Sequence, residues 1–216
     1  AISQLSYFHF VSHEVYKKNL IKIGIHKKNI LVVGGLGASS INKVKIESKK
    51  FLEKKLKLKL NKKYLLVTYH PVTLKEYAHK DEFINLMNCL DSFKDVIKIV
   101  TAPNIDNNNK NIINVIKYFI KNKKNFYYFK SLGSKNYYSL MSHSNGVVGN
   151  SSSGILEAPS FKVPTLNIGN RQIGRVQAKS VVNVNFKRNQ ILRGLNKILN
   201  NIKFKKKLNH VSNIYF

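Results

Sequence analysis

The sequence carries a candidate anion-binding turn in its last third, where an apolar strand gives way to small hydroxyl residues. Residues 149–160 read GNSSSGILEAPS, and a helix is predicted to begin among Ser151, Ser152 and Ser153. Serine side chains can cap such a helix, and its free backbone N–H groups attract a phosphate. Glu157 lies about one and a half turns further along, where its carboxylate can accept both hydroxyls of a ribose. Simple capping beside an exposed acid explains the same residues, so this turn alone leaves both readings open.

Two arginines follow the next predicted strand. Residues 167–175 read NIGNRQIGR, and Arg171 and Arg175 are two of only four arginines among 38 basic residues. A guanidinium offers a planar pair of donors to phosphate oxygens, whereas lysine acts as a point charge. The use of arginine here predicts a phosphate contact, and an ordinary charged surface turn is the alternative.

A histidine stands at the end of another β-rich run, in VTYHPVT at residues 67–73. Pro71 holds the residue before it in an extended conformation, so His70 is presented at a strand tip. An imidazole there can bind a diphosphate oxygen or transfer a proton near neutral pH, which makes His70 the catalytic candidate. A single histidine at a strand end is also a common structural feature.

Two further loops follow predicted strands and carry weaker signals. TAPNIDNNNK at residues 101–110 offers Asn104 and Lys110, and polar turn chemistry explains it equally well. GGLGASS at residues 34–40 lacks dinucleotide-binding spacing and a Walker lysine, so we expect a close-packed turn. The histidines and the few acids show no metal-ligand spacing, and we predict neither a metal site nor a cofactor.

These loops need a scaffold that brings them together, and short apolar runs alternating with longer amphipathic segments predict one. Such an order is typical of an α/β, doubly wound, Rossmann-like parallel sheet, which binds ligands outside the carboxyl ends of its strands. Strands are predicted at residues 8–11, 30–35, 64–70, 95–101, 126–129, 146–149 and 163–169, and helices at 14–23, 44–60, 80–90, 108–121, 135–143, 152–160 and 189–201.

The overall amino-acid composition limits the classes of partner and the location expected for this chain. The net charge of +28 would attract a polyanion. However, lysine and asparagine fill unpatterned runs, and an A/T-rich genome favours the codons of these residues at solvent-exposed positions. We therefore favour mutational bias over a nucleic-acid surface. No run approaches about 18 apolar residues and no secretory leader is visible, so we expect a cytoplasmic protein without a membrane partner. The single Cys89 allows no intramolecular disulfide and is expected in the core.

Taken together, the motifs resemble the UDP-N-acetylglucosamine 2-epimerase family, in its hydrolysing branch that feeds sialic- and legionaminic-acid-type sugar synthesis. The resemblance spans nearly the whole chain and rests on LSYFHFVSHE, HPVT, PNIDNNNK and VGNSSSGILEAPSFKVPTLNIGNRQIGR. Members have two Rossmann-like domains with UDP in the cleft, a layout similar to GT-B glycosyltransferases. The resemblance implies that residues 1–216 are the UDP-binding C-terminal half with a lead-in, and that the family's N-terminal domain is absent.

The resemblance also assigns roles, position by position. Ser151 and Ser152 would hold phosphate through hydroxyls and backbone amides, and Glu157 would take the ribose hydroxyls. The remaining assignments are Arg171 on the diphosphate, His70 against the phosphate or sugar, Asn104 and Lys110 along the same cleft, and Leu132 and Tyr137 as a wall for the uracil.

In this family the reaction is thought to eliminate UDP to give a 2-acetamidoglucal, which then adds water at the anomeric carbon with inversion at C2. The carboxylates that move protons belong to the first domain, and Glu14, Glu76, Asp81 and Glu82 match none of them. We therefore expect the full-length protein to be the enzyme, and this chain alone to bind UDP with little or no activity.

Several alternatives stay open from the sequence. The substrate is UDP-N-acetylglucosamine or a bacillosamine-type analogue, and a homodimer is the assembly that the resemblance implies. A half of a GT-B glycosyltransferase would also place a UDP-sugar on a serine-rich turn. A basic nucleic-acid-binding domain is the non-enzymatic alternative, and its affinity would fall steeply with salt.

Overall fold

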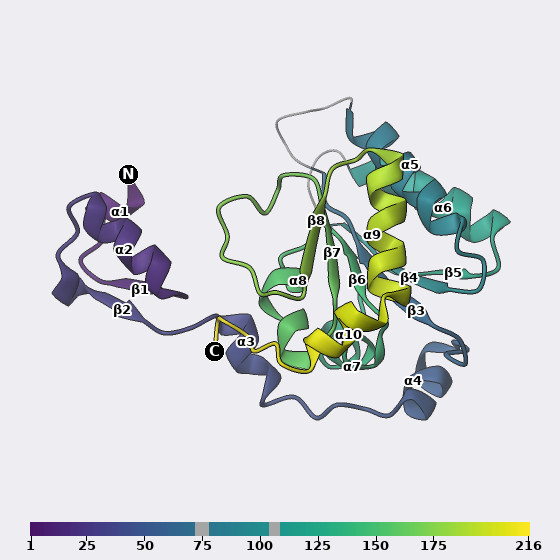
Figure 1. Ribbon diagram of the computed structural model, residues 1–216, viewed down its shortest axis with the longest axis horizontal. Helices are drawn as coiled ribbons and strands as arrows, with labels where there is room; N and C mark the ends of the chain where they lie inside the picture. Colours follow the sequence, from purple (N-terminus) through teal and green to yellow (C-terminus); the bar gives the residue numbers. More distant parts are fainter. Residues whose placement is uncertain (72–77, 104–108) are drawn as a thin grey trace.

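A six-stranded parallel sheet forms the centre of the computed structural model, which describes residues 1–71, 78–103 and 109–216 (Figure 1). Its strands run in the order β5-β4-β3-β6-β7-β8, so the winding reverses between β3 and β6. A crevice opens at the carboxyl ends of the strands at such a reversal. The strands are β3 (Tyr64–Thr68), β4 (Ile97–Thr101), β5 (Phe126–Phe129), β6 (Val147–Gly149), β7 (Thr165–Ile168) and β8 (Val181–Val184).

Helices cover both faces of this sheet, and β3 shows why. All five residues of β3 are buried, and alternate side chains enter two separate cores. Leu65 and Val67 pack against α5, α6 and α9, whereas Tyr64 and Leu66 pack on the side of α4, α7 and η2. The bounds are α4 (Lys49–Leu56), α5 (Ala78–Asp91), α6 (Asn109–Asn122), α7 (Gly133–His143), α8 (Ser153–Leu156), the 3-10 helix η2 (Ala158–Phe161), α9 (Arg188–Asn200) and α10 (Ile202–Leu208).

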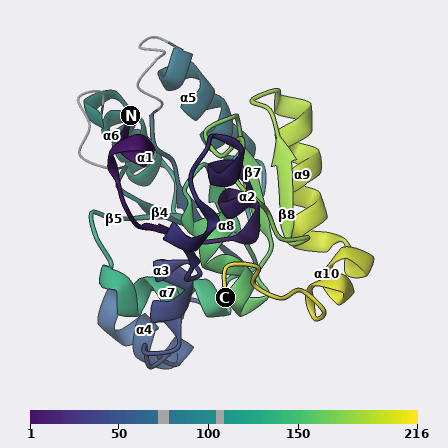
Figure 2. The same ribbon diagram turned by 90° about the vertical axis from the view of Figure 1, so that its left-hand side faces the viewer.

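The first 33 residues form a smaller unit beside the main sheet (Figures 1 and 2). Its two strands pair in parallel with each other, with Phe10 opposite Leu31, and the sheet has no third strand among the described residues. Phe10 is 68% exposed and Leu31 is 44% exposed. The unit consists of α1 (Ile2–Leu5), β1 (His9–Val11), α2 (Glu14–Lys22), the 3-10 helix η1 (Lys27–Asn29) and β2 (Ile30–Val32).

The C-terminal residues tie this unit to the main body. The backbone N–H of Gly35 donates to the carbonyl of Tyr215 over 2.7 Å, just before α3 (Leu36–Ile41). The hydroxyls of Tyr16 and Tyr215 lie 2.9 Å apart, and each also bonds the backbone of Val176. Gly34 has a φ of +75°, and a Cβ there would meet the Tyr215 carbonyl oxygen at 2.8 Å. Gly34 and Gly35 are thus closely packed, as the sequence predicts, but the prediction of a turn is wrong for residues 36–40, which belong to α3.

The structure departs from the predicted elements at the ends of the chain and at breaks in helices. The helix predicted over 44–60 begins only at Lys49, where the Ser48 hydroxyl accepts from the Phe51 N–H and caps it. The helix predicted over 152–160 is wrong as one element. It divides into α8 and η2 because Pro159 lacks an N–H and its ring crowds the preceding turn. The short elements α3, β8 and α10 were not predicted.

Within the described residues, no helix combines the length and the apolar character needed to cross a membrane. Cys89 is fully buried in the core on the α5 side of the sheet, as expected.

Candidate functional site

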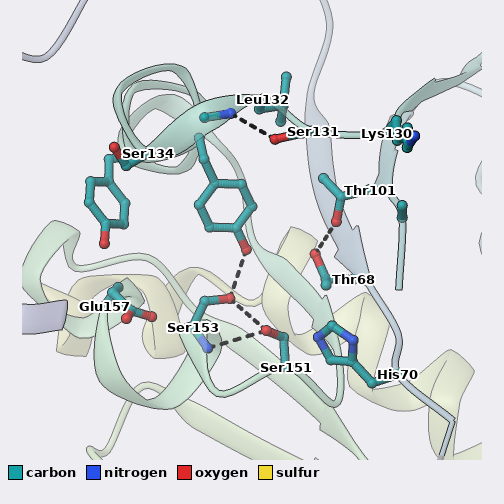
Figure 3. A pocket seen from close by; sticks show the side chains of 14 residues that line it. Thr68, His70, Thr101, Lys130, Ser131, Leu132, Ser134, Ser151, Ser153 and Glu157 are labelled. Atoms are coloured by element: carbon teal, nitrogen blue, oxygen red, sulfur yellow. Dashed lines mark hydrogen bonds between the residues drawn. The ribbon is translucent and has the colours of Figure 1, made fainter. Parts of the chain in front are cut away.

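A cavity of about 370 Å³ opens at the carboxyl edge of the main sheet, beside the point where its winding reverses (Figure 3). The register places Thr68 beside Gly149, so the loops that follow β3 and β6 start next to each other. Figure 3 shows Ser151 and Ser153 between Glu157 and His70. The described lining residues are Thr68, His70, Thr101, Ala102, Lys130, Ser131, Leu132, Gly133, Ser134, Tyr137, Tyr138, Ser151, Ser153 and Glu157.

One wall of the cavity is a chain of hydroxyl groups. The hydroxyls of Tyr137 and Ser153 lie 2.7 Å apart, and Ser153 Oγ donates to Ser151 Oγ over 3.1 Å. The backbone N–H of Ser153 also points at Ser151 Oγ, at 3.4 Å. Burial raises the pKa of Tyr137, so its phenol stays protonated at neutral pH. These neutral donors suit an oxyanion, which accepts hydrogen bonds without requiring a metal ion.

The strand ends supply a second pair of hydroxyls. Thr68 and Thr101 are the last residues of β3 and β4, and their side-chain oxygens lie 2.6 Å apart. Both are buried and line the cavity. Because β3 and β4 are parallel neighbours, their final side chains meet at the same edge of the sheet.

Glu157 has a carboxyl group with one oxygen that lacks a hydrogen-bond partner within the described part of the chain. Its Oε2 is buried and has no hydrogen-bond partner among the described residues. Burial raises the pKa of this carboxyl to about 7, and the positive charge of Arg175 offsets part of the rise. The backbone of Gly37 lies so close to Oε1 that any Cβ at that position would overlap it. The carboxyl group therefore packs against the Gly37 backbone and keeps an oxygen that can accept a further donor.

The structure brings five of the predicted site residues around one cavity: His70, Leu132, Tyr137, Ser151 and Glu157. Arg171 is exposed on the loop after β7, and its Nη1 donates to the carbonyl of Asn150 over 3.1 Å, next to the serine turn. Asn104 falls outside the described residues. The helix α6 contains Lys110, but the structure does not describe its side chain. The ligand contacts of all these residues stay predictions.

Ser152 sits differently from its neighbours. It precedes α8, its carbonyl accepts from the N–H groups of Ile155 and Leu156, and it is not among the described residues that line the cavity. Its side chain makes no capping bond, and Ser151 accepts from Ser153 instead. Because α8 has only four residues, its helix dipole is small. The longer helix expected from the sequence would attract an anion more strongly through its dipole, so here the hydroxyl groups are the main groups available to attract one.

Sequence reasoning did not single out several lining residues, namely Thr68, Thr101, Lys130, Ser131, Ser134 and Tyr138. A usable signal existed for the threonines, because each closes an apolar strand whose carboxyl end faces the crevice. Ser153 was predicted only as one of three serines at the start of the helix, and no local pattern marks it above its neighbours. Among residues 1–71, 78–103 and 109–216, no three His, Cys, Asp or Glu side chains group closely enough to hold a metal ion.

The chain resembles known proteins along its whole length. The model of a family described as UDP-N-acetylglucosamine 2-epimerase matches residues 1–216. The GDP/UDP-N,N'-diacetylbacillosamine 2-epimerase (hydrolyzing) of Campylobacter jejuni is 41% identical over 183 residues, which are 84% of this chain and 48% of that protein. The polysialic acid biosynthesis protein P7 of Escherichia coli is 37% identical over 217 residues and aligns with 100% of this chain and 55% of its own length.

Solved structures share the fold at lower identity. The structure of S. aureus MnaA with UDP has a TM-score of 0.78 at 15% identity, over 99% of this chain and 56% of that one. The chain thus spans about half the length of the relatives it matches, as one Rossmann-like half of a GT-B-like architecture. From the full-length family match and these relatives, we conclude that the chain belongs to the UDP-N-acetylglucosamine 2-epimerase family and fits its hydrolysing branch.

Proposed function

We propose that the cavity binds the UDP moiety of a UDP-sugar, and that the full-length protein is a hydrolysing UDP-N-acetylglucosamine 2-epimerase. The carrying observation is that the partly unsatisfied Glu157 carboxylate and the serine hydroxyls share one cavity. A volume of about 370 Å³ falls within the range of small-molecule sites. The Campylobacter relative, named as a hydrolysing 2-epimerase of a GDP- or UDP-linked sugar, supports the same chemistry.

The proposed fit follows from donors and acceptors. Ser151 and Ser153 donate to phosphate oxygens, and Arg171, which already contacts the serine turn, supplies positive charge from outside. Glu157 accepts from the two ribose hydroxyls, which are donors of the kind its free oxygen lacks. Leu132 and Tyr137 then lie where the uracil would stack, beside the start of α7.

The proposed chemistry breaks the bond between the anomeric carbon and the diphosphate, so charge builds on the departing UDP. Hydroxyl and guanidinium groups around the serine turn stabilise that charge. His70 lines the same cavity and is placed to hold a phosphate oxygen or to transfer a proton to it. This half therefore serves the leaving group, whereas proton removal at C2 falls to groups on the first domain.

The domain boundary is part of the proposal. Residues 1–33 form a two-stranded parallel sheet with exposed Phe10 and Leu31, and parallel sheets are normally covered on both faces. We assign them to a first Rossmann-like domain whose remaining strands and helices come from elsewhere in the full-length protein. The nucleotide domain then begins near α3. A homodimer stays a prediction.

Calorimetric titration of this chain with UDP tests the binding site. Wild type should release heat, and Arg171→Ala and Glu157→Ala should each weaken binding by about tenfold to a hundredfold, because each loses a charge-assisted hydrogen bond of roughly 1.5 to 3 kcal/mol. Arg193→Ala and Glu14→Gln, at exposed positions on α9 and α2, are matched controls and should bind as wild type does.

Two outcomes would count against the site. Equal losses in the control variants would point to general charge rather than to this cavity. If neither this chain nor the full-length protein released heat on addition of UDP, the assignment of the cavity as a UDP site would be overturned. Raising the salt concentration separates the nucleic-acid alternative, since polyanion binding through many lysines collapses steeply whereas UDP binding should decline gradually.

The reaction is tested on the full-length protein with UDP-N-acetylglucosamine and with the diacetylbacillosamine analogue, in D₂O and without an acceptor. Hydrolytic epimerisation should release UDP and a free sugar of manno configuration that carries deuterium at C2. A glycosyltransferase would leave the UDP-sugar largely intact until an acceptor is added. Comparison of the two rates identifies the preferred substrate.

A further inference from the structure

We infer that Asn150 is the positioning residue that holds His70, the serine turn and Arg171 in one arrangement. This inference rests on the proposed UDP site and adds a residue to it. Asn150 lies between Gly149 and Ser151 and is 1% exposed. It is not among the described residues that line the cavity, so it acts through its neighbours rather than on the ligand.

The side-chain amide of Asn150 pairs reciprocally with the backbone of His70. The N–H of His70 donates to Oδ1 over 2.7 Å, and Nδ2 donates to the carbonyl of His70 over 2.7 Å. Because a backbone N–H can only donate and a carbonyl can only accept, the orientation of the amide is determined. Two opposed bonds fix both the position and the rotation of the peptide that carries His70.

The backbone of Asn150 joins two further segments. Its N–H donates to the carbonyl of Thr68 over 3.2 Å, which continues the pairing of β6 with β3. Its carbonyl accepts from Nη1 of Arg171 at 3.1 Å and from Nε2 of Gln172 at 2.7 Å. One buried residue thus contacts the end of β3, the histidine tip and the arginine loop.

Asparagine suits this position for a chemical reason. His70 precedes Pro71, which has no N–H, and β6 ends at Gly149, so ordinary strand pairing stops here. The amide takes over the pairing by offering one acceptor and one donor. Alanine would leave both backbone groups of His70 without these partners in a buried setting, and aspartate would face the His70 carbonyl with negative charge.

The role implies that His70 and Arg171 depend on Asn150 together. Removal of the Asn150 side-chain amide frees the backbone of His70. It also loosens the backbone at Asn150, whose carbonyl accepts the hydrogen bond from Arg171. The loss of UDP affinity in Asn150→Ala should therefore overlap with that in Arg171→Ala instead of adding to it.

The test uses the 216-residue chain and two readouts, with Asn167→Ala as matched control. Asn167 is also a buried amide, 3% exposed, and it bonds Asn183 away from the cavity. Amide hydrogen exchange should show His70 exchanging at least about tenfold faster in Asn150→Ala than in wild type, and unchanged in Asn167→Ala. UDP titration should show about tenfold weaker binding in Asn150→Ala, and a smaller effect of Arg171→Ala in that background than in wild type.

The outcomes separate this inference from the proposed function. If wild type and the full-length protein both fail to bind UDP, the function fails, and the exchange measurement still decides whether Asn150 holds His70. Unchanged His70 exchange in Asn150→Ala, or strictly additive losses with Arg171→Ala, would overturn the inference. Should Asn150→Ala not fold, Asn150→Asp serves in its place, because it keeps the shape and the Oδ1 acceptor but replaces the Nδ2 donor with a carboxylate oxygen that faces the His70 carbonyl. A UDP affinity of Asn150→Asp equal to that of wild type would also overturn the inference.

Discussion

Replacing Gly149 with alanine is expected to destabilise the chain by about 4 kcal/mol or more and to remove UDP binding with it. Gly149 has a φ of +131°, and a Cβ there would overlap the backbone carbonyl of Thr68. Neither strand can yield, because β3 and β6 pair through these two residues at the centre of the sheet. A urea denaturation curve followed by circular dichroism measures the loss.

The matched control for this prediction is Gly133→Ala. Gly133 also has a positive φ, +65°, but nothing lies within 4 Å of the position its Cβ would take. The cost should be about 1 kcal/mol, the ordinary penalty for a left-handed alanine. Equal destabilisation by the two variants would show that backbone conformation alone matters at Gly149 and that the contact with Thr68 does not.

The second large effect is a gain of stability in Glu157→Gln above neutral pH. Burial raises the pKa of this carboxyl from 4.5 to about 7, so the folded chain keeps a proton that the unfolded chain has already lost. The contribution of Glu157 to the free energy of unfolding therefore falls as pH rises from about 4.5 to 7, and stays low above that. Glutamine removes the penalty, and we expect a gain of about 2 to 3 kcal/mol at pH 8.

The pH dependence identifies the cause of that gain. The difference in unfolding free energy between Glu157→Gln and wild type should be near zero at pH 4 and reach its full size by pH 8. Glu14→Gln, at an exposed acid in the first turn of α2, should show no such trend. The same Glu157→Gln chain should bind UDP about tenfold more weakly, because an amide offers the ribose only one acceptor. A gain that is constant with pH would contradict the burial of an ionised carboxylate.

The regular elements could be predicted where burial imposes a strong pattern. YLLVT reads as a strand because the centre of a parallel sheet is buried on both faces, and β3 appears where expected. Val181–Val184 was missed because this edge strand is short and only half-buried. The short helices α10 and α3 carry weak local signals. Tertiary contacts such as that between Gly35 and Tyr215 stabilise the region around α3 instead.

The candidate site could be predicted loop by loop but not as a geometry. Histidine before proline, serines before a helix and arginine after a strand are each visible in sequence. The distances between these loops depend on the order of the strands in the sheet. Because β3 and β6 are neighbours, His70 lies beside the serine turn, although 80 residues separate His70 from Asn150. The roles of Asn150 and Ser153 required that proximity to be known.

By itself, the sequence determined the α/β class, the loops that face the crevice and the family, because apolar periodicity and residue chemistry are local properties. Only the tertiary structure decided that residues 1–33 stand apart from the main sheet and that the Glu157 carboxyl packs against Gly37 with its Oε2 buried. It also decided that one asparagine joins three segments of the site. Burial and hydrogen bonding between distant segments arise from packing, and packing is a property of the whole chain.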